Sequence, residues 1–234
     1  MKNDLPKLTP RLELVASMVR DGIKLADIGT DHAYIPVYLV NSQKCKGAIA
    51  GDVIVGPLER AKKTAVLFNA EGKIRFILTD GLHGIEENEA DDIVIAGMGG
   101  ELISKIIDEC GWIKNSSKHL VLQPMTAVED LRQYLSANGF EIEKEAVAAE
   151  KNESKLYVVM SVFYRGKKET TDELFNDVGK LADNKDEITA QYLKRKAESI
   201  LKHAEGLEKA KADNSDEIKH LKKLANEILN IFEK

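Results

Sequence analysis

Acidic residues, a glycine and a histidine follow an apolar segment near the start of the chain, in the stretch Leu25–Tyr34. Leu25–Ile28 has the composition of a strand, and it stops at Gly29, with Asp31 and His32 close behind. A strand that ends on glycine and leads into a helix forms the first ligand loop of nucleotide-binding α/β domains. We therefore expect this stretch to be the binding site of the protein.

A second acid, Asp52, ends another apolar segment and lies 23 residues after Gly29. An acid at about this spacing commonly binds the ribose of an adenosine-containing cofactor, because one carboxylate can accept hydrogen bonds from both hydroxyls. The alternative is a solvated acid at the end of a strand. The Gly29 loop and a further strand-end pair, Asp80-Gly81, favour ribose binding.

The composition of the first loop bears on which cofactor it holds. Gly29 occupies one glycine position of the dinucleotide motif, but Asp31 stands where the second glycine would sit. Asp31 would place negative charge against a pyrophosphate, which needs glycines to approach a helix N-terminus. S-adenosylmethionine has no phosphate and carries a sulfonium cation, so the loop favours it over NAD. An NAD(P)-dependent oxidoreductase and a non-catalytic RNA-binding protein stay as alternatives.

Three of the four residues in Gly97-Met98-Gly99-Gly100 are glycines, and they follow a fourth apolar segment. A tight turn between a strand and a helix would need only one glycine. The additional glycines indicate a close approach of the backbone to a ligand, with free N–H and C=O groups. His32 and Tyr34, in contrast, fit a substrate contact and an ordinary packing role equally well.

The chain has 234 residues, of which 43% are hydrophobic and 31% charged, as is typical of a globular protein with a substantial core. It contains no apolar run of about 18 residues, and its first residues lack the apolar core of a signal peptide. Cys45 and Cys110 lie in unrelated contexts and the five histidines are scattered, so we expect neither disulfides nor a metal site. We expect a cytoplasmic monomer.

The net charge of −5 argues weakly against nucleic-acid binding, but the charge is unevenly distributed. Residues 165–234 hold 15 basic and 15 acidic side chains, so the acidic excess lies in residues 1–164. Basic clusters occur at Lys62-Lys63, Arg165–Lys168 and Lys194–Lys196. Each such cluster is usually a solvated surface, although a local basic face could bind a phosphate backbone.

The candidate site residues follow segments with the patterns of strands. Before them, Thr9-Pro10 has the hydroxyl and the proline that are typical of a helix start, and Gly22 ends that segment. Later, Thr126–Glu129 has the pattern of a capping box before a further helix, and a polar turn at residues 151–154 separates two closing strands. The predicted strands are residues 24–28, 46–52, 74–79, 92–96, 120–124, 142–149 and 156–164.

The order of a helix, five strand–helix steps and a final strand pair predicts a parallel, doubly wound α/β sheet with an antiparallel edge. The segment Gly81–Asp91, between the third and fourth strands, is short for a full crossover helix. Ligands bind such sheets across the carboxyl ends of the strands. The acids and glycines described above stand at those ends. They should therefore meet along one side of the sheet, the edge that the carboxyl ends of the strands form.

The composition changes after Lys168, and no proline or strand pattern follows. Thr170–Glu173 is a second candidate capping box, and apolar residues beyond it keep a heptad-like spacing that Asp213–Ser215 interrupts. We therefore predict a helical hairpin of coiled-coil type. The expected division is a cofactor-binding domain, residues 1–166, and a helical appendage, residues 167–234.

Two strings, Asp27–Tyr34 and Ala96–Gly100, together resemble the bacterial tRNA (adenine(22)-N1)-methyltransferase family. The resemblance covers residues 8–162 and includes the helical appendage. It implies a Rossmann-like class I methyltransferase fold, S-adenosylmethionine as methyl donor and N1 of an adenine in tRNA as acceptor. Further matching segments are Ile49–Asp52, Gly56-Pro57, Gly81-Leu82 and Leu122–Pro124.

The resemblance also implies roles for individual residues. Asp31 is the implied catalytic group on the acceptor side, and His32, Tyr34 and Gln123 are implied substrate contacts. Met125 departs from the family, which commonly has Asn after Gln-Pro, and Asp52 stands where Glu is common. The implied cofactor contacts are Asp27, Gly29, Thr30, Asp52, Asp80, Gly81, Ala96, Gly97, Met98 and Gly99.

Overall fold

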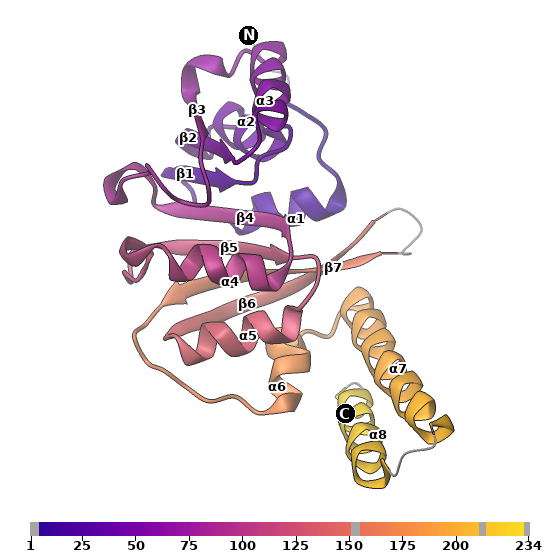
Figure 1. Cartoon of the computed structure of the whole chain (residues 1–234). Coiled ribbons are helices and arrows are strands. Elements are labelled where there is room, and N and C mark those ends of the chain that lie inside the picture. Colours follow the sequence, from indigo (N-terminus) through magenta and orange to yellow (C-terminus); the bar gives the residue numbers. More distant parts are fainter. Residues whose placement is uncertain (1–4, 151–154, 211–213, 232–234) are drawn as a thin grey trace.

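The computed structural model describes residues 5–150, 155–210 and 214–231, and it is built around one seven-stranded sheet (Figure 1). The strand order is β3-β2-β1-β4-β5-β7-β6. The first five strands pair in parallel, and β7 pairs antiparallel with β5 on one side and with β6 on the other. The predicted sheet with an antiparallel edge is confirmed. The strands are β1 Ile23–Ile28, β2 Cys45–Asp52, β3 Ile74–Leu78, β4 Asp92–Met98, β5 His119–Pro124, β6 Phe140–Ala149 and β7 Leu156–Tyr164.

Helices cover both faces of this sheet. Side chains alternate along each strand, so neighbours such as Leu25 and Ala26 enter different hydrophobic clusters. One cluster joins the sheet to α1, α2 and α3, and the other joins it to α4 and α5. These helices are α1 Pro10–Met18, α2 Tyr34–Asn41, α3 Val55–Leu67, α4 Gly100–Asp108 and α5 Val128–Ala137.

The connection between β3 and β4 differs from the other crossovers. It contains a short 3-10 turn, Glu87–Glu89, and no α-helix. The prediction of five strand–helix steps is therefore wrong at this step, because Gly81–Asp91 is too short to cross the sheet and also form a covering helix.

Two of the three predicted helix starts need correction. Thr9 caps α1 as predicted, since its hydroxyl accepts from the Leu12 N–H. The predicted capping box at Thr126–Glu129 does not form: Ala127, with φ of 52°, precedes α5 and no side chain caps it. The carbonyl of Thr126 instead accepts from Gly100 N at 2.8 Å, so this backbone joins two loops. The third start lies two residues later than predicted, because Asp172, and not Thr170, caps α6.

The C-terminal region contains α6 (Glu173–Val178), α7 (Glu187–Lys209) and α8 (Ser215–Leu229). Helices α7 and α8 lie side by side and project from the sheet at the lower right of Figure 1, which confirms the predicted helical hairpin. The expected polar turn at residues 151–154 lies outside the described residues.

A buried ion pair ties this region to the sheet. Arg132 on α5 and Glu145 on β6 are both completely buried, and their Nε and Oε1 atoms lie 2.9 Å apart. Arg132 also donates to the carbonyls of Asn176 and Asp177, while Glu145 Oε2 accepts from the N–H of Lys180. The segment that precedes the hairpin is thus packed as part of the core.

Candidate functional site at the carboxyl ends of the strands

Backbone hydrogen bonds join the strand ends that carry the predicted site residues. The N–H groups of Gly29 and Thr30 both donate to the carbonyl of Gly51, at 2.8 and 3.0 Å. The N–H of Thr79 donates to Asp52, and that of Met125 to Met98, at 2.9 and 2.8 Å. The loops therefore form one edge, as the sequence predicts.

The glycines at this edge mainly make room for other parts of the chain. Gly29 has a φ of 78°, and a Cβ on it would lie 2.1 Å from Cε of Met98. A Cβ on Gly100 would lie 2.2 Å from the carbonyl oxygen of Ala127. The sequence indicates that the glycine run lies close to a ligand. At Gly100 the close neighbour is instead the protein's own backbone. Within the run Gly97–Gly100, Gly97, with a φ of 81°, has the backbone conformation that favours glycine.

The buried acid Asp27 is the most perturbed titratable group at this edge. Burial raises its pKa to about 6, with a further rise from the charge of Asp52 against the opposing effect of the neighbouring Thr30 hydroxyl. The Thr30 Oγ1 atom is buried and has no hydrogen-bond partner among the described residues. Asp52 is half-buried and its Oδ1 accepts from the N–H of Ile54 at 2.8 Å. These groups are available to a polar or cationic ligand.

Asp31, His32 and Tyr34 lie together and face solvent. The Asp31 side chain is 61% exposed, and its Oδ2 lies 3.4 Å from Nε2 of His32. The rings of His32 and Tyr34 stack, with centroids 5.2 Å apart and planes within 9°. Arg60 on α3 forms an ion pair with Asp31. The structure thus brings the predicted acceptor-side residues into one exposed cluster.

Gln123 does not face this cluster. Its side chain is completely buried at the end of β5, where Oε1 accepts from Arg11 Nη1 at 2.6 Å and from Gly97 N at 3.1 Å. Its Nε2 donates to the carbonyl of Pro124. The place of Gln123 therefore suits positioning of the loop after β4 better than the direct substrate contact that the resemblance implies.

The remaining predicted contacts lie in the loops after β3 and β4. Asp80 is exposed, and its backbone carbonyl lies 2.6 Å from Nδ1 of His83. Gly81 has a φ of 57° and lies against Ile106. Ala96 lies near the end of β4, which Met98 ends, and Gly99 lies in the turn between β4 and α4.

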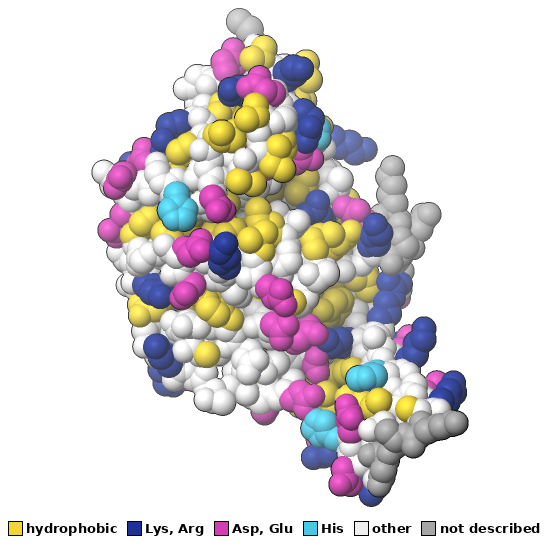
Figure 2. Space-filling view, viewed as in Figure 1, with side chains coloured by type: hydrophobic (Ala, Val, Ile, Leu, Met, Phe, Trp, Pro, Cys, Tyr) yellow, Lys and Arg dark blue, Asp and Glu magenta, His cyan; other side chains and the backbone are white. Residues whose placement is uncertain are grey.

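Several residues at this edge escaped sequence reasoning. Val53, Ile54 and Leu78 are large apolar side chains, each more than half exposed, beside Asp52 and Thr79. In the space-filling view, hydrophobic side chains gather over the upper part of the molecule, which holds β2, β3 and α3 (Figure 2). The available signal was apolar residues at or directly after strand ends, where solvated loops usually carry polar ones. No feature of the sequence indicated that Arg60 would lie beside Asp31.

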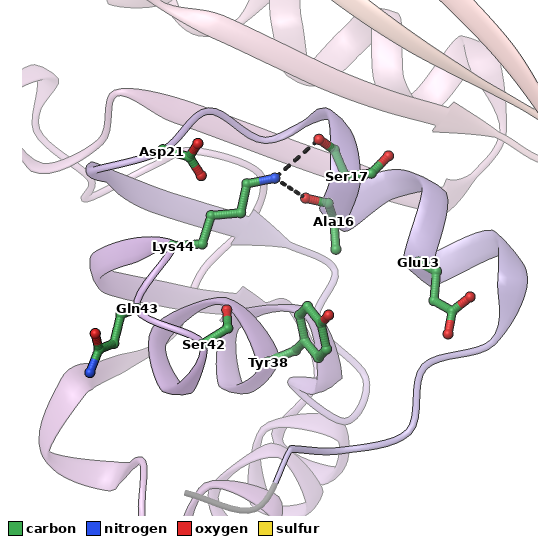
Figure 3. Close-up of a pocket in the computed structure, with 8 residues that line it drawn as sticks. All are labelled: Glu13, Ala16, Ser17, Asp21, Tyr38, Ser42, Gln43 and Lys44. Atoms are coloured by element: carbon green, nitrogen blue, oxygen red, sulfur yellow. Dashed lines mark hydrogen bonds between the residues drawn. The ribbon is translucent and has the colours of Figure 1, made fainter. Parts of the chain in front are cut away.

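A separate cavity of about 560 Å³ lies near α1 and α2 (Figure 3). Its residues include Glu13, Asp21 and Tyr38, and the Lys44 ammonium donates to the carbonyls of Ala16 and Ser17 at 2.9 and 3.1 Å. Lys44 thereby satisfies carbonyls in the last turn of α1. No residue of the glycine loops lines this cavity, so it is distinct from the site.

Residues 5–150, 155–210 and 214–231 contain neither a membrane-spanning helix nor a cluster of metal ligands. None of the helices there is long and apolar enough to cross a membrane. No group of three or more His, Cys, Asp or Glu side chains in these ranges could hold a metal ion.

The fold and the loop arrangement define a Rossmann-like methyltransferase architecture. Residues 8–160 match the family described as "Methyltransferase domain". The chain belongs to this family.

Individual relatives give more detail. The chain is 39% identical, over 155 residues, to the tRNA (adenine(22)-N(1))-methyltransferase of Bacillus subtilis, an alignment that spans 66% of this chain and 64% of that relative. The crystal structure of the B. subtilis m1A22 tRNA methyltransferase matches with a TM-score of 0.82 and 31% identity, over 95% of this chain and 99% of that one. A Streptococcus pneumoniae protein in complex with S-adenosyl-L-methionine matches equally, with a TM-score of 0.82, 32% identity and coverage of 95% and 100%.

Proposed function

We propose that this protein transfers a methyl group from S-adenosylmethionine to N1 of the adenine at position 22 of tRNA. The observation that carries the proposal is the exposed Asp31 carboxylate beside a stacked His32–Tyr34 pair, on the same edge as the buried Asp27. The B. subtilis relative named for this reaction supports it. The first loop, with an acid in place of the second dinucleotide glycine, gives no support to an NAD(P)-dependent oxidoreductase.

The residues present fit this cofactor. Asp27 and the unpartnered Thr30 hydroxyl suit a cationic, hydrogen-bonding amino-acid group, and Asp52 suits a ribose. Val53, Ile54 and Leu78 offer apolar surface for a purine ring. When bound, S-adenosylmethionine supplies an electrophilic methyl group on a sulfonium centre.

The acceptor chemistry needs little from the protein beyond orientation. Neutral adenine N1 carries a lone pair, so it requires no base before attack, and correct alignment supplies much of the rate enhancement. Methylation makes the ring cationic and its exocyclic amine more acidic. Asp31 accepts a hydrogen bond from that amine, which fixes the base edge and stabilises the developing charge.

The target base must leave the stacked tRNA before it can reach this edge, at a cost of a few kcal/mol. Tyr34, 39% exposed and stacked on His32, offers a surface for the extruded base. The α7–α8 hairpin, which belongs to the appendage expected at residues 167–234, acts as a clamp on the body of the tRNA. The protein works as a monomer in the cytoplasm.

Mass spectrometry of unmodified tRNA, incubated with the protein and S-adenosylmethionine, tests the proposal directly. We expect one added methyl group, located as 1-methyladenosine at position 22 after nuclease digestion. A tRNA that carries A22G is the control and should remain unmodified. Binding of tRNA without any methylation would instead identify a non-catalytic RNA-binding protein.

A further inference from the structure

Arg60 makes a contact with the proposed acceptor-side acid that the methyl-transfer chemistry does not by itself require. Its Nε donates to Oδ1 of Asp31 at 3.1 Å, and its Nη2 donates to the same oxygen. The other carboxylate oxygen, Oδ2, lies 3.4 Å from His32 Nε2, longer than the usual range of about 2.7–3.2 Å. The guanidinium thus occupies one oxygen and leaves the second available.

We propose that Arg60 is a positioning residue, which holds Oδ1 so that Oδ2 is presented to the exocyclic amine of the target adenine. The inference rests on the proposed function, because it gives Arg60 a role only through Asp31. It adds a residue from α3 to a site otherwise built from the strand-end loops.

The exposure of Asp31 explains why it needs such a partner. A solvent-exposed carboxylate on a loop can rotate among several conformers. The planar guanidinium has fixed donor directions, so two N–H groups on one oxygen restrict that rotation. An ion pair this exposed adds little to folding stability. Orientation of the carboxylate is therefore the effect that the pair can supply.

Arg60 lies on the helix that directly follows the acid proposed to bind the cofactor. Helix α3 begins at Val55, directly after the Asp52 loop, in which Asp52 Oδ1 accepts from the Ile54 N–H. The acid proposed to bind the cofactor ribose therefore lies just before α3, and Arg60 lies in the second turn of that helix. Helix α3 thus connects Asp52, on the cofactor side, with the arginine that contacts Asp31 on the acceptor side.

Steady-state kinetics of Arg60→Ala and Arg60→Lys with tRNA and S-adenosylmethionine test this role. We expect Arg60→Ala to lower kcat about 10- to 100-fold, with the KM values for both substrates within about twofold of wild type. Arg60→Lys, with one charge but no planar fork, should retain an intermediate kcat. Added guanidinium ion should partly restore the activity of Arg60→Ala.

Arg75 provides a matched control. It is also an exposed arginine in an ion pair, with Glu89 at 2.9 Å, and its side chain is 45% exposed compared with 48% for Arg60. Arg75→Ala should leave kcat unchanged. A second check combines Arg60→Ala with Asp31→Ala: if Arg60 acts through Asp31, the double variant should lose no more activity than Asp31→Ala alone.

Three results would overturn the role of Arg60 while leaving methyl transfer by the wild type intact. The first is an unchanged kcat in Arg60→Ala. The second is a raised kcat, which would mean that Arg60 blocks Asp31. The third is a raised KM for tRNA alone, which would make Arg60 a phosphate contact. Absence of methylation by the folded wild type would instead refute the proposed function.

Discussion

Two buried aspartates on neighbouring strands show how the carboxyl ends of the strands differ from their amino ends. Asp27 lies near the end of β1, and its pKa is raised to about 6, chiefly by burial. Asp92 lies at the start of β4, where burial also acts to raise its pKa, but hydrogen bonds from His119 and Arg20 outweigh burial and lower it below the usual value. Asp27, at the carboxyl ends of the strands, is thus left in need of a partner, whereas Asp92, at the amino ends, is fully hydrogen-bonded.

The contrast extends to the neighbouring histidines. His119 is buried, with Nδ1 2.9 Å from Asp92 Oδ2 and Nε2 2.8 Å from Ser161 Oγ. His32, beside Asp31, is only half-buried and stacks on Tyr34. An acid, a histidine and a serine within hydrogen-bonding distance form a structural network when they are enclosed. Asp27, buried without a charged partner, and Asp31, exposed at the same strand ends, are the acids that can bind a ligand.

The largest predicted effect is on the enclosed network. Asp92→Ala should destabilise the protein by about 3–5 kcal/mol, because it leaves the buried His119 and the half-buried Arg20 without their shared acceptor. Asp92 has a lowered pKa, so its contribution is present above about pH 4 and is lost as the pH falls further. Urea unfolding at pH 7 and pH 3 measures this. Equal stability of variant and wild type at pH 7 would show that the network is not structural.

The next effect is on activity. Asp31→Ala should reduce kcat about 10²- to 10³-fold, since it removes the acceptor for the adenine amine. The affinity for S-adenosylmethionine should survive, and so should stability, because the side chain is mostly exposed. Calorimetric binding and methyl-transfer assays separate these quantities. Turnover near the wild-type rate would remove Asp31 from the mechanism.

A third prediction concerns Asp27. Its raised pKa means that its favourable contribution to folding is fully present below about pH 4 and is lost as the pH rises through about 6. Asp27→Asn cannot ionise, so without cofactor it should be more stable than the wild type at pH 8, by up to about 3 kcal/mol. The difference should vanish near pH 4. Urea unfolding across this range tests it, and equal stability of Asp27→Asn and the wild type at pH 8 would contradict it.

Sequence reasoning could propose a candidate site because strand ends, glycines and acids are local features. The strand that ends at Gly29 and the acid at Asp52 follow from patterns of a few residues, and parallel pairing then brings them together. The same reasoning could not place Arg60 beside Asp31, because that pair joins residues 29 positions apart through the orientation of α3. Thr126 likewise has the sequence of a helix cap, yet its backbone is used to hold Gly100. Such tertiary contacts override local preferences.

The weakest expected effect is at the hairpin. Deleting it would be uninformative, since Leu193 on α7 and Ile228 on α8 are buried in the core. Lys196 in its basic cluster is held by Asp177 and Glu129, at 2.8 and 3.2 Å, so it serves packing. Lys194 and Lys202 are exposed on α7 and are the better candidates for binding phosphate.

Replacing both Lys194 and Lys202 with alanine should weaken tRNA binding by a few-fold. The slope of log Kd against log salt should also fall by about 1 for each phosphate that the variant no longer neutralises. Fluorescence anisotropy over a range of salt concentrations measures this. Lys105→Ala, on the exposed side of α4, is the control and should not change the slope. An unchanged slope in the double variant would mean that α7 does not touch the RNA, so that binding would rest on the strand-end edge alone.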